Sequence, residues 1–152
     1  FGKARALQKE NAPVSPERHY QPLRILVVED NNFNQLLARE FLNMHLPDSK
    51  VSIAENGKIA LEQVNQQKFD LILMDIKMPI MNGYEASKAI RALDNPKKAM
   101  IPIIGLTAHI VPEQLEKCQE AGMNDCISKP FDMETLLDCI YKHTIHLHEH
   151  QS

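Results

Sequence analysis

Short apolar runs, each bounded by polar residues, recur along most of the chain. The clearest are Ile25-Leu26-Val27-Val28 and Leu71-Ile72-Leu73-Met74. Uninterrupted apolar runs of this length are typical of strands buried on both faces of a parallel sheet. The strands predicted in this way cover 24–28, 51–54, 70–74, 102–106 and 125–128.

The segments between these runs carry apolar residues at the spacing of amphipathic helices. Helices are predicted near 33–46, 57–66, 84–93, 112–121 and 133–145. Asn31 or Asn32 can cap the first helix, and Asn95-Pro96 is expected to end the third. The inner face expected for the first helix is Leu36, Leu37, Phe41 and Met44.

The last predicted helix follows Asp132, which can cap it. Its expected apolar face is Met133, Leu136, Leu137, Ile140 and Thr144. Strict alternation of strands and helices predicts an α/β fold, with a parallel sheet, helices on both faces and right-handed crossovers.

The predicted organisation is a linker or the end of a preceding element at 1–22, a domain at 23–146 and a disordered tail at 147–152. The segment from Gly2 to Lys9 could form a short helix, and the prolines that follow it favour a linker. The histidines near the end could bind metal or belong to a solvated helix end; they are His143, His146, His148 and His150.

Composition narrows the possible classes of protein. A chain of 152 residues with 43% apolar residues suits one domain, and its net charge of −3 does not suggest nucleic acid or an anionic membrane as a partner. No apolar run approaches the roughly 18 residues of a membrane helix, and no signal peptide is visible. Cys118, Cys126 and Cys139 form no CxxC pair, and their odd number fits a reduced, cytoplasmic location better than a disulfide framework. Because the chain begins with Phe1, we interpret it as part of a longer protein.

Three acids follow two of the predicted strands. Glu29 and Asp30 follow the first, and Asp75 follows the third. Because the carboxyl ends of parallel strands meet at one edge of the sheet, these acids are expected to crowd one small site. Close carboxylates raise each other's pKa, and a hard divalent cation such as Mg²⁺ suits this set of oxygen ligands. The ends of two further strands bring Thr107 and Lys129 to the same edge.

This constellation resembles the receiver domain of two-component response regulators. The resemblance covers about residues 23 to 143 and rests on four motifs: Glu29-Asp30, the segment from Met74 to Glu85, Leu106-Thr107-Ala108, and Ser128-Lys129-Pro130-Phe131. It implies a flavodoxin-like, doubly wound five-stranded sheet of order 2-1-3-4-5. The segments from Glu29 to Gln35, from Leu106 to His109 and from Ala121 to Asp125 look most like the C-terminal receiver of a hybrid sensor histidine kinase.

The resemblance also implies the site roles. Asp75 is the expected phosphoacceptor, and the expected Mg²⁺ ligands are Asp30, Asp75, the Lys77 backbone carbonyl and, through a water, Glu29. Lys129 and Thr107 are expected to contact the phosphoryl group, and Lys129 is aimed by a cis bond to Pro130 in the family.

The expected partner is a histidine kinase or a histidine phosphotransfer domain. A domain that relays phosphate is expected to bind it through the first helix and the loops around Asp75 and Lys129. The candidate contact residues are Asn34, Leu37, Ala38 and Phe131.

Cys126 departs from the family pattern. Receivers usually place Tyr, Phe or His three residues before the lysine, and that ring moves inward on phosphorylation. Cysteine is a small hydrophobe that cannot act in this way. We therefore expect modest rearrangement of the fourth helix and fifth strand when the domain is phosphorylated.

Other functions stay open at this stage. Within the family, the alternative is a free-standing single-domain regulator, and whether the whole protein is an enzyme depends on a histidine kinase part outside these residues. A phosphatase with an aspartyl nucleophile would need a second acid two residues after Asp75, where the chain has Lys77. A nucleotide or flavin binder would need a phosphate-binding loop after the first strand, where the chain has Glu29-Asp30.

Overall fold

The computed structural model describes residues 22–129 and 132–149. The short helix predicted at 2–9, the Lys129–Pro130 bond and Phe131 involve residues outside this described part. Of the described helices, none is long and apolar enough to span a bilayer.

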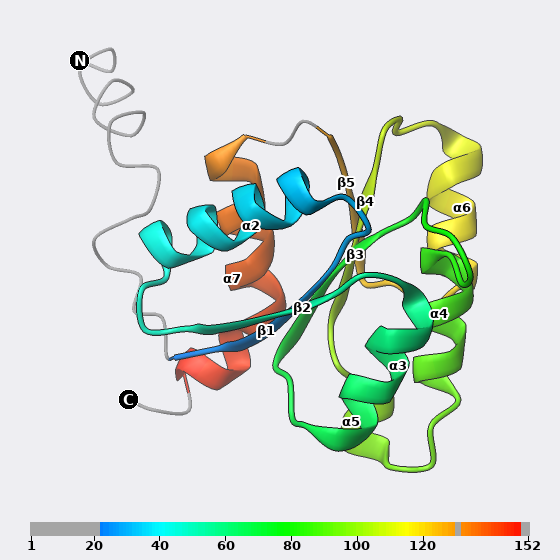
Figure 1. Cartoon of the computed structure of the whole chain (residues 1–152), viewed down its shortest axis with the longest axis horizontal. Coiled ribbons are helices and arrows are strands. Elements are labelled where there is room, and N and C mark those ends of the chain that lie inside the picture. Colours follow the sequence, from blue (N-terminus) through cyan, green and yellow to red (C-terminus); the bar gives the residue numbers. More distant parts are fainter. Residues whose placement is uncertain (1–21, 130–131, 150–152) are drawn as a thin grey trace.

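Five parallel strands form one sheet, in the order β2-β1-β3-β4-β5 (Figure 1). The strands are β1 (Arg24–Val28), β2 (Lys50–Ala54), β3 (Leu71–Asp75), β4 (Ile103–Thr107) and β5 (Asp125–Ser128). The predicted doubly wound α/β fold and its strand order are confirmed, with strand bounds that differ from the prediction by at most one residue. β3 lies at the centre, so its last residue, Asp75, is held between two neighbouring strands.

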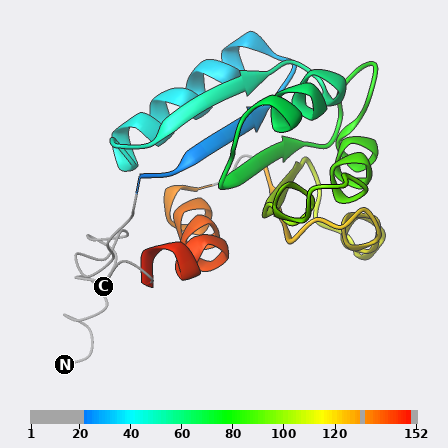
Figure 2. The same ribbon diagram turned by 90° about the horizontal axis from the view of Figure 1, so that it is seen from below.

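Helices cover both faces of this sheet. They are α2 (Asn32–His45), α3 (Gly57–Gln66), α4 (Gly83–Arg91), α5 (Pro96–Ala99), α6 (Pro112–Glu120) and α7 (Met133–Glu149). α2 and α7 lie on one face, and α3, α4 and α6 lie on the other (Figures 1 and 2). Each face therefore has its own apolar layer, as the two-sided burial of the strands requires.

The short helix α5 was not predicted. Asn95 caps it by accepting a hydrogen bond from the Lys97 N–H, and Pro96 occupies its first turn. The Asn95-Pro96 pair therefore begins a helix, whereas the preceding helix α4 ends earlier, at Arg91. Proline fits the first turn of a helix as well as it ends one, so the pair alone did not distinguish the two cases.

The predicted inner face of α2 is largely wrong. Leu36, Leu37 and Met44 are 51%, 50% and 73% exposed, and only Phe41 of the predicted set packs against the core. The helix instead buries Leu42 against the sheet. The sequence carries two apolar stripes on this helix, and the pattern alone does not say which of them meets the sheet.

α7 buries Leu136, Leu137, Ile140 and Thr144 as predicted, whereas Met133 is 38% exposed in the first turn. The Thr144 hydroxyl donates to the Ile140 carbonyl, which satisfies it inside the core. The helix continues to Glu149, so residues 147–149 are helical although they were assigned to a disordered tail beyond the boundary at 146.

Candidate functional site

The carboxyl ends of four strands bring the predicted site residues to one edge of the sheet. Asp75 and Thr107 are the last residues of β3 and β4. Glu29 directly follows β1, and Lys129 directly follows β5. The Lys129 backbone N–H also donates to the Thr107 carbonyl at 2.7 Å, which fixes the two strand ends side by side.

Three carboxylates meet at this edge. One oxygen from each of Glu29, Asp30 and Asp75 lies within 4.8 Å of the other two. Glu29 and Asp75 are buried, at 4% and 6% exposure, whereas Asp30 is open to solvent. The structure therefore gathers the acids that the sequence placed at one site, with one of them facing the outside.

Lys129 is the cation nearest the two buried acids. Its Nζ lies 3.2 Å from Asp75 Oδ1 and 3.3 Å from Glu29 Oε1. Burial alone would lower the pKa of Lys129, but Asp75 and Glu29 raise it above its usual value. The side chain therefore stays charged at neutral pH.

The pKa of the Asp75 carboxyl is raised as well, which for an acid favours the neutral form. Burial, reinforced by the charge of Glu29, raises its pKa, and Lys129 offsets only part of that effect. One ammonium group does not neutralise three carboxylates, so the ionised site carries excess negative charge. A divalent cation would relieve this repulsion.

This excess charge predicts how stability depends on pH and Mg²⁺. Because the folded pKa of Asp75 is raised, its contribution to stability is present below the unfolded pKa of about 3.9 and is lost as pH rises through the folded value. Without metal at neutral pH, Asp75→Asn should therefore have a higher melting temperature than the wild type. The difference should shrink in acid, as measured by thermal melts in chelator.

Mg²⁺ should raise the melting temperature of the wild type, and Asp30→Ala should lose that shift. Asp48→Ala is the matched control, since Asp48 is an exposed acid two residues before β2, at the opposite, amino end of that strand. An equal Mg²⁺ shift in Asp30→Ala and wild type would contradict the metal site.

The structure gives the positions of Thr107 and Lys77 but does not test the roles predicted for them. The Thr107 side chain is buried, and its hydroxyl donates to the His109 carbonyl at 3.2 Å, so it is engaged with its own loop. Lys77 lies in the loop after β3 with an exposed side chain. A phosphoryl contact from Thr107 and a metal contact from the Lys77 carbonyl stay predictions.

Two residues that orient Glu29 were not predicted for that role. Gln35 Nε2 donates to the Glu29 carbonyl at 2.7 Å, and Asn34 Nδ2 lies 3.4 Å from Glu29 Oε2, which also accepts the Asn31 N–H. Both side chains belong to the first turns of α2, just after the acid pair. The one sign of this role in the sequence is that amide side chains follow the acid pair within a few residues.

The loop from Asp75 to α4 is tightly constrained. The Gly83 N–H donates to the Ile76 carbonyl, and a Cβ on Gly83 would lie 2.4 Å from the Asp75 carbonyl oxygen. Glycine is therefore required for this close approach beneath the nucleophile candidate. Ile80 in the same loop has φ 71° and is 77% exposed, an unfavourable conformation for a β-branched residue.

Cys126 of β5 packs against the apolar layer that contains Ile76 and Ala86, on the face of the sheet covered by α3, α4 and α6. Its sulfur is 3.0 Å from that of Cys118, and burial together with Cys118 raises the pKa of Cys126 to about 12. Tyr84 of α4 packs against the same apolar cluster, and its hydroxyl donates to Gln114. The structure thus places an aromatic residue here from α4, which the sequence did not reveal.

The donor set fits Mg²⁺. Three carboxylates, two of them buried and one exposed, supply hard oxygen ligands with a route to solvent. No thiol or imidazole is a member of this group.

Comparison with known proteins gives the family. A family model described as "Response regulator receiver domain" matches residues 25–141. Hybrid signal transduction histidine kinase I of Dictyostelium discoideum is 40% identical over 124 residues, covering 78% of this chain and 7% of that protein. Sensor protein GacS of Pseudomonas syringae pv. syringae is 34% identical over 134 residues, covering 88% of this chain and 15% of that protein. The chain thus spans a small part of these curated relatives.

Two solved structures are similar in fold and sequence. The receiver domain of sensor histidine kinase PA1611 from Pseudomonas aeruginosa PAO1, with a magnesium ion in its active site cleft, is 35% identical with a TM-score of 0.72. The alignment covers 82% of this chain and 98% of the PA1611 receiver chain. The receiver domain of Ssk1, solved with the histidine phosphotransfer protein Ypd1 of Saccharomyces cerevisiae, is 28% identical with a TM-score of 0.77. That alignment covers 84% of this chain and 92% of the other.

Proposed function

Because the chain belongs to the response regulator receiver domain family, we propose that it accepts a phosphoryl group on Asp75 and relays it to or from a histidine on a partner. The observation that carries this proposal is the buried Asp75 carboxylate, set between Lys129 and two further acids at the carboxyl edge of the sheet. The parent protein would be a hybrid sensor histidine kinase, and the two relatives at 40% identity are named hybrid signal transduction histidine kinases.

Asp75 acts as the nucleophile in this reaction. One of its carboxylate oxygens attacks the phosphorus of a phosphohistidine, an O–P bond forms, and the N–P bond breaks. The electron pair of that bond returns to the imidazole nitrogen. Phosphoryl transfer requires alignment and neutralisation of charge more than covalent assistance, so the neighbouring residues supply charge and hydrogen bonds.

Lys129 and Thr107 stabilise the transferred group. Lys129 already contacts Asp75, so its ammonium needs little movement to pair with a phosphoryl oxygen. The Thr107 hydroxyl would exchange its bond to His109 for a phosphoryl oxygen. Asp30, Asp75, the Lys77 carbonyl and, through water, Glu29 would hold Mg²⁺. The cation would supply positive charge to the equatorial phosphoryl oxygens.

The partner surface would begin at the first half of α2. A groove of about 520 Å³ beside this helix runs from Leu37, Ala38 and Phe41 to Glu29 and Lys129. Leu37 is 50% exposed at its rim, and the nearby Phe33 is 66% exposed. Apolar residues that lead directly to the reactive acid fit a histidine-bearing helix bundle, which must bring its imidazole to Asp75.

Leu37→Arg should therefore separate docking from chemistry. Phosphoryl transfer from a phosphorylated histidine phosphotransfer domain should slow by about tenfold or more, because a charge replaces a docking side chain. Uptake from a small phosphodonor should stay unchanged, because the apolar Leu37 side chain supplies neither charge nor a hydrogen bond to the reacting groups. Rates of labelled phosphoryl transfer measure both.

Met44→Arg is the matched control, since Met44 is an exposed apolar residue near the other end of the same helix. Equal losses for Leu37→Arg and Met44→Arg, or normal transfer to Leu37→Arg, would overturn this docking surface without affecting the assignment of Asp75.

We infer a cytoplasmic location for this domain. The free thiols of Cys118, Cys126 and Cys139 support this inference, since such cysteines persist in a reducing compartment.

A further inference from the structure

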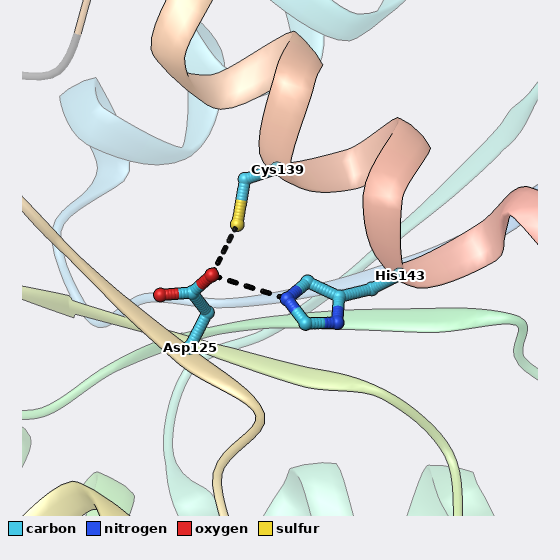
Figure 3. Close-up of side chains that lie close together, drawn as sticks. All are labelled: Asp125, Cys139 and His143. Atoms are coloured by element: carbon cyan, nitrogen blue, oxygen red, sulfur yellow. Dashed lines mark hydrogen bonds and ion pairs between the residues drawn. The ribbon is translucent and has the colours of Figure 1, made fainter.

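A second cluster of metal-binding side chains lies away from the acidic site. Asp125 Oδ2 is 3.1 Å from His143 Nε2 and 3.5 Å from Cys139 Sγ (Figure 3). Asp125 is the first residue of β5, whereas Lys129 follows the other end of this strand. The two clusters therefore belong to opposite edges of the sheet.

The backbone fixes this geometry. Cys139 and His143 are four residues apart on α7, so they project from the same side of the helix. Both point toward the Asp125 carboxylate (Figure 3). Cys118 and Cys126 pack in the apolar layer on the opposite face of the sheet, so Cys139 is separate from that pair.

The chemistry of the three side chains suits zinc. Zn²⁺ takes thiolate, imidazole and carboxylate ligands at about 2.0–2.3 Å in a tetrahedron, which sets neighbouring ligand atoms roughly 3.3–3.7 Å apart. The two contacts of Asp125, at 3.1 and 3.5 Å, are close to that spacing, and all three ligand atoms lie within 4.8 Å of one another. The groups need only small movements to admit the ion.

The surroundings also favour binding. Cys139 is buried at 8% exposure, and the His143 side chain is 15% exposed, so both are held by packing. Asp125 Oδ1 accepts the Cys126 N–H, which orients the carboxylate and leaves Oδ2 facing α7. Lys142 Nζ is 3.9 Å from Oδ2, but this side chain is 71% exposed and can turn to solvent. A depression lined by Asp125, Cys139 and Thr135 gives an entry path and leaves space for a water ligand at the fourth position.

We propose that Asp125, Cys139 and His143 form a Zn²⁺ site that fastens α7 to the start of β5. The ion replaces the hydrogen bonds that now join these groups, and the thiol proton is released to solvent on binding. The site is independent of phosphoryl transfer at Asp75.

Co²⁺ is a suitable probe, because a cobalt–thiolate bond gives a near-ultraviolet charge-transfer band and tetrahedral cobalt absorbs strongly in the visible. Excess Mg²⁺ would keep cobalt from the carboxylate site. The wild type should show both signals, and added Zn²⁺ should remove them. Cys139→Ser should lose the charge-transfer band, whereas Cys118→Ser, which removes a different buried thiol, should keep it.

Thermal melts give a second readout that does not depend on colour. Zn²⁺ should raise the melting temperature of the wild type but not that of Asp125→Asn or His143→Asn, two near-isosteric changes that test the site even if Cys139→Ser fails to fold. Replacing His146, His148 and His150 together by Gln should leave both the cobalt–thiolate band and the zinc shift in melting temperature unchanged. No thiolate band, a band that survives Cys139→Ser, or a zinc response lost with those three histidines would overturn the proposal.

Discussion

Asp75→Asn should take up no phosphoryl group from a small phosphodonor in the presence of Mg²⁺. The amide has no carboxylate oxygen to attack phosphorus, and the remaining acids of the cluster are not equivalent. Glu29 accepts hydrogen bonds from the Asn31 N–H and from Lys129, and Asp30 is exposed to solvent. Uptake measured by intact mass should therefore fall to background, although the variant is expected to be folded and more stable without metal.

Asp94→Asn is the control for this change, because Asp94 is an exposed acid between α4 and α5. It should take up the phosphoryl group at the wild-type rate. Persistent uptake in Asp75→Asn, or an equal loss in both variants, would contradict the assignment of the nucleophile.

Lys129→Met should slow phosphoryl uptake by about 10²–10³-fold, the usual cost of removing one preorganised donor from a transition state. Methionine keeps much of the volume of the side chain but removes the charge that lies 3.2 Å from Asp75. Without metal the variant should also melt at a lower temperature, since Glu29 and Asp75 lose their shared cation. For the same reason, Mg²⁺ should stabilise it more than it stabilises the wild type.

Lys88→Met is the control, because it removes an exposed lysine charge from α4, at a residue that is not proposed to hold Mg²⁺ or the phosphoryl group. Its uptake should stay close to wild type. A Lys129→Met protein that reacts at the normal rate would show that the ammonium contributes nothing to transfer.

The fold was largely predictable because two independent signals agree along the chain. Buried parallel strands need continuous apolar runs, and the crossover helices between them need amphipathic spacing. The predictions that were wrong concern features that depend on how the elements pack. The exposure of Leu37 and the burial of Leu42 are set by how α2 lies on the sheet, and a sequence with two apolar stripes does not specify that.

The site was predictable because a parallel sheet brings all its strand ends to one edge. Residues at the end of a strand or directly after it, such as Asp75 and Lys129, are therefore neighbours whatever their separation in sequence. The hydrogen bond from Gln35 to Glu29, the packing of Tyr84 in the same apolar layer as Cys126 and the contact of Asp125 with α7 depend on side-chain directions between elements. No local spacing encodes those contacts.

Chemical mapping of the modified residue tests the central claim most directly. After the domain is phosphorylated with Mg²⁺ and a small phosphodonor, borohydride reduction converts an aspartyl phosphate to homoserine, which peptide mass spectrometry locates. Our account predicts homoserine at position 75 and nowhere else, with none formed when Mg²⁺ is chelated. A phosphoryl group that maps to another residue, while Asp75 stays unmodified, would contradict it.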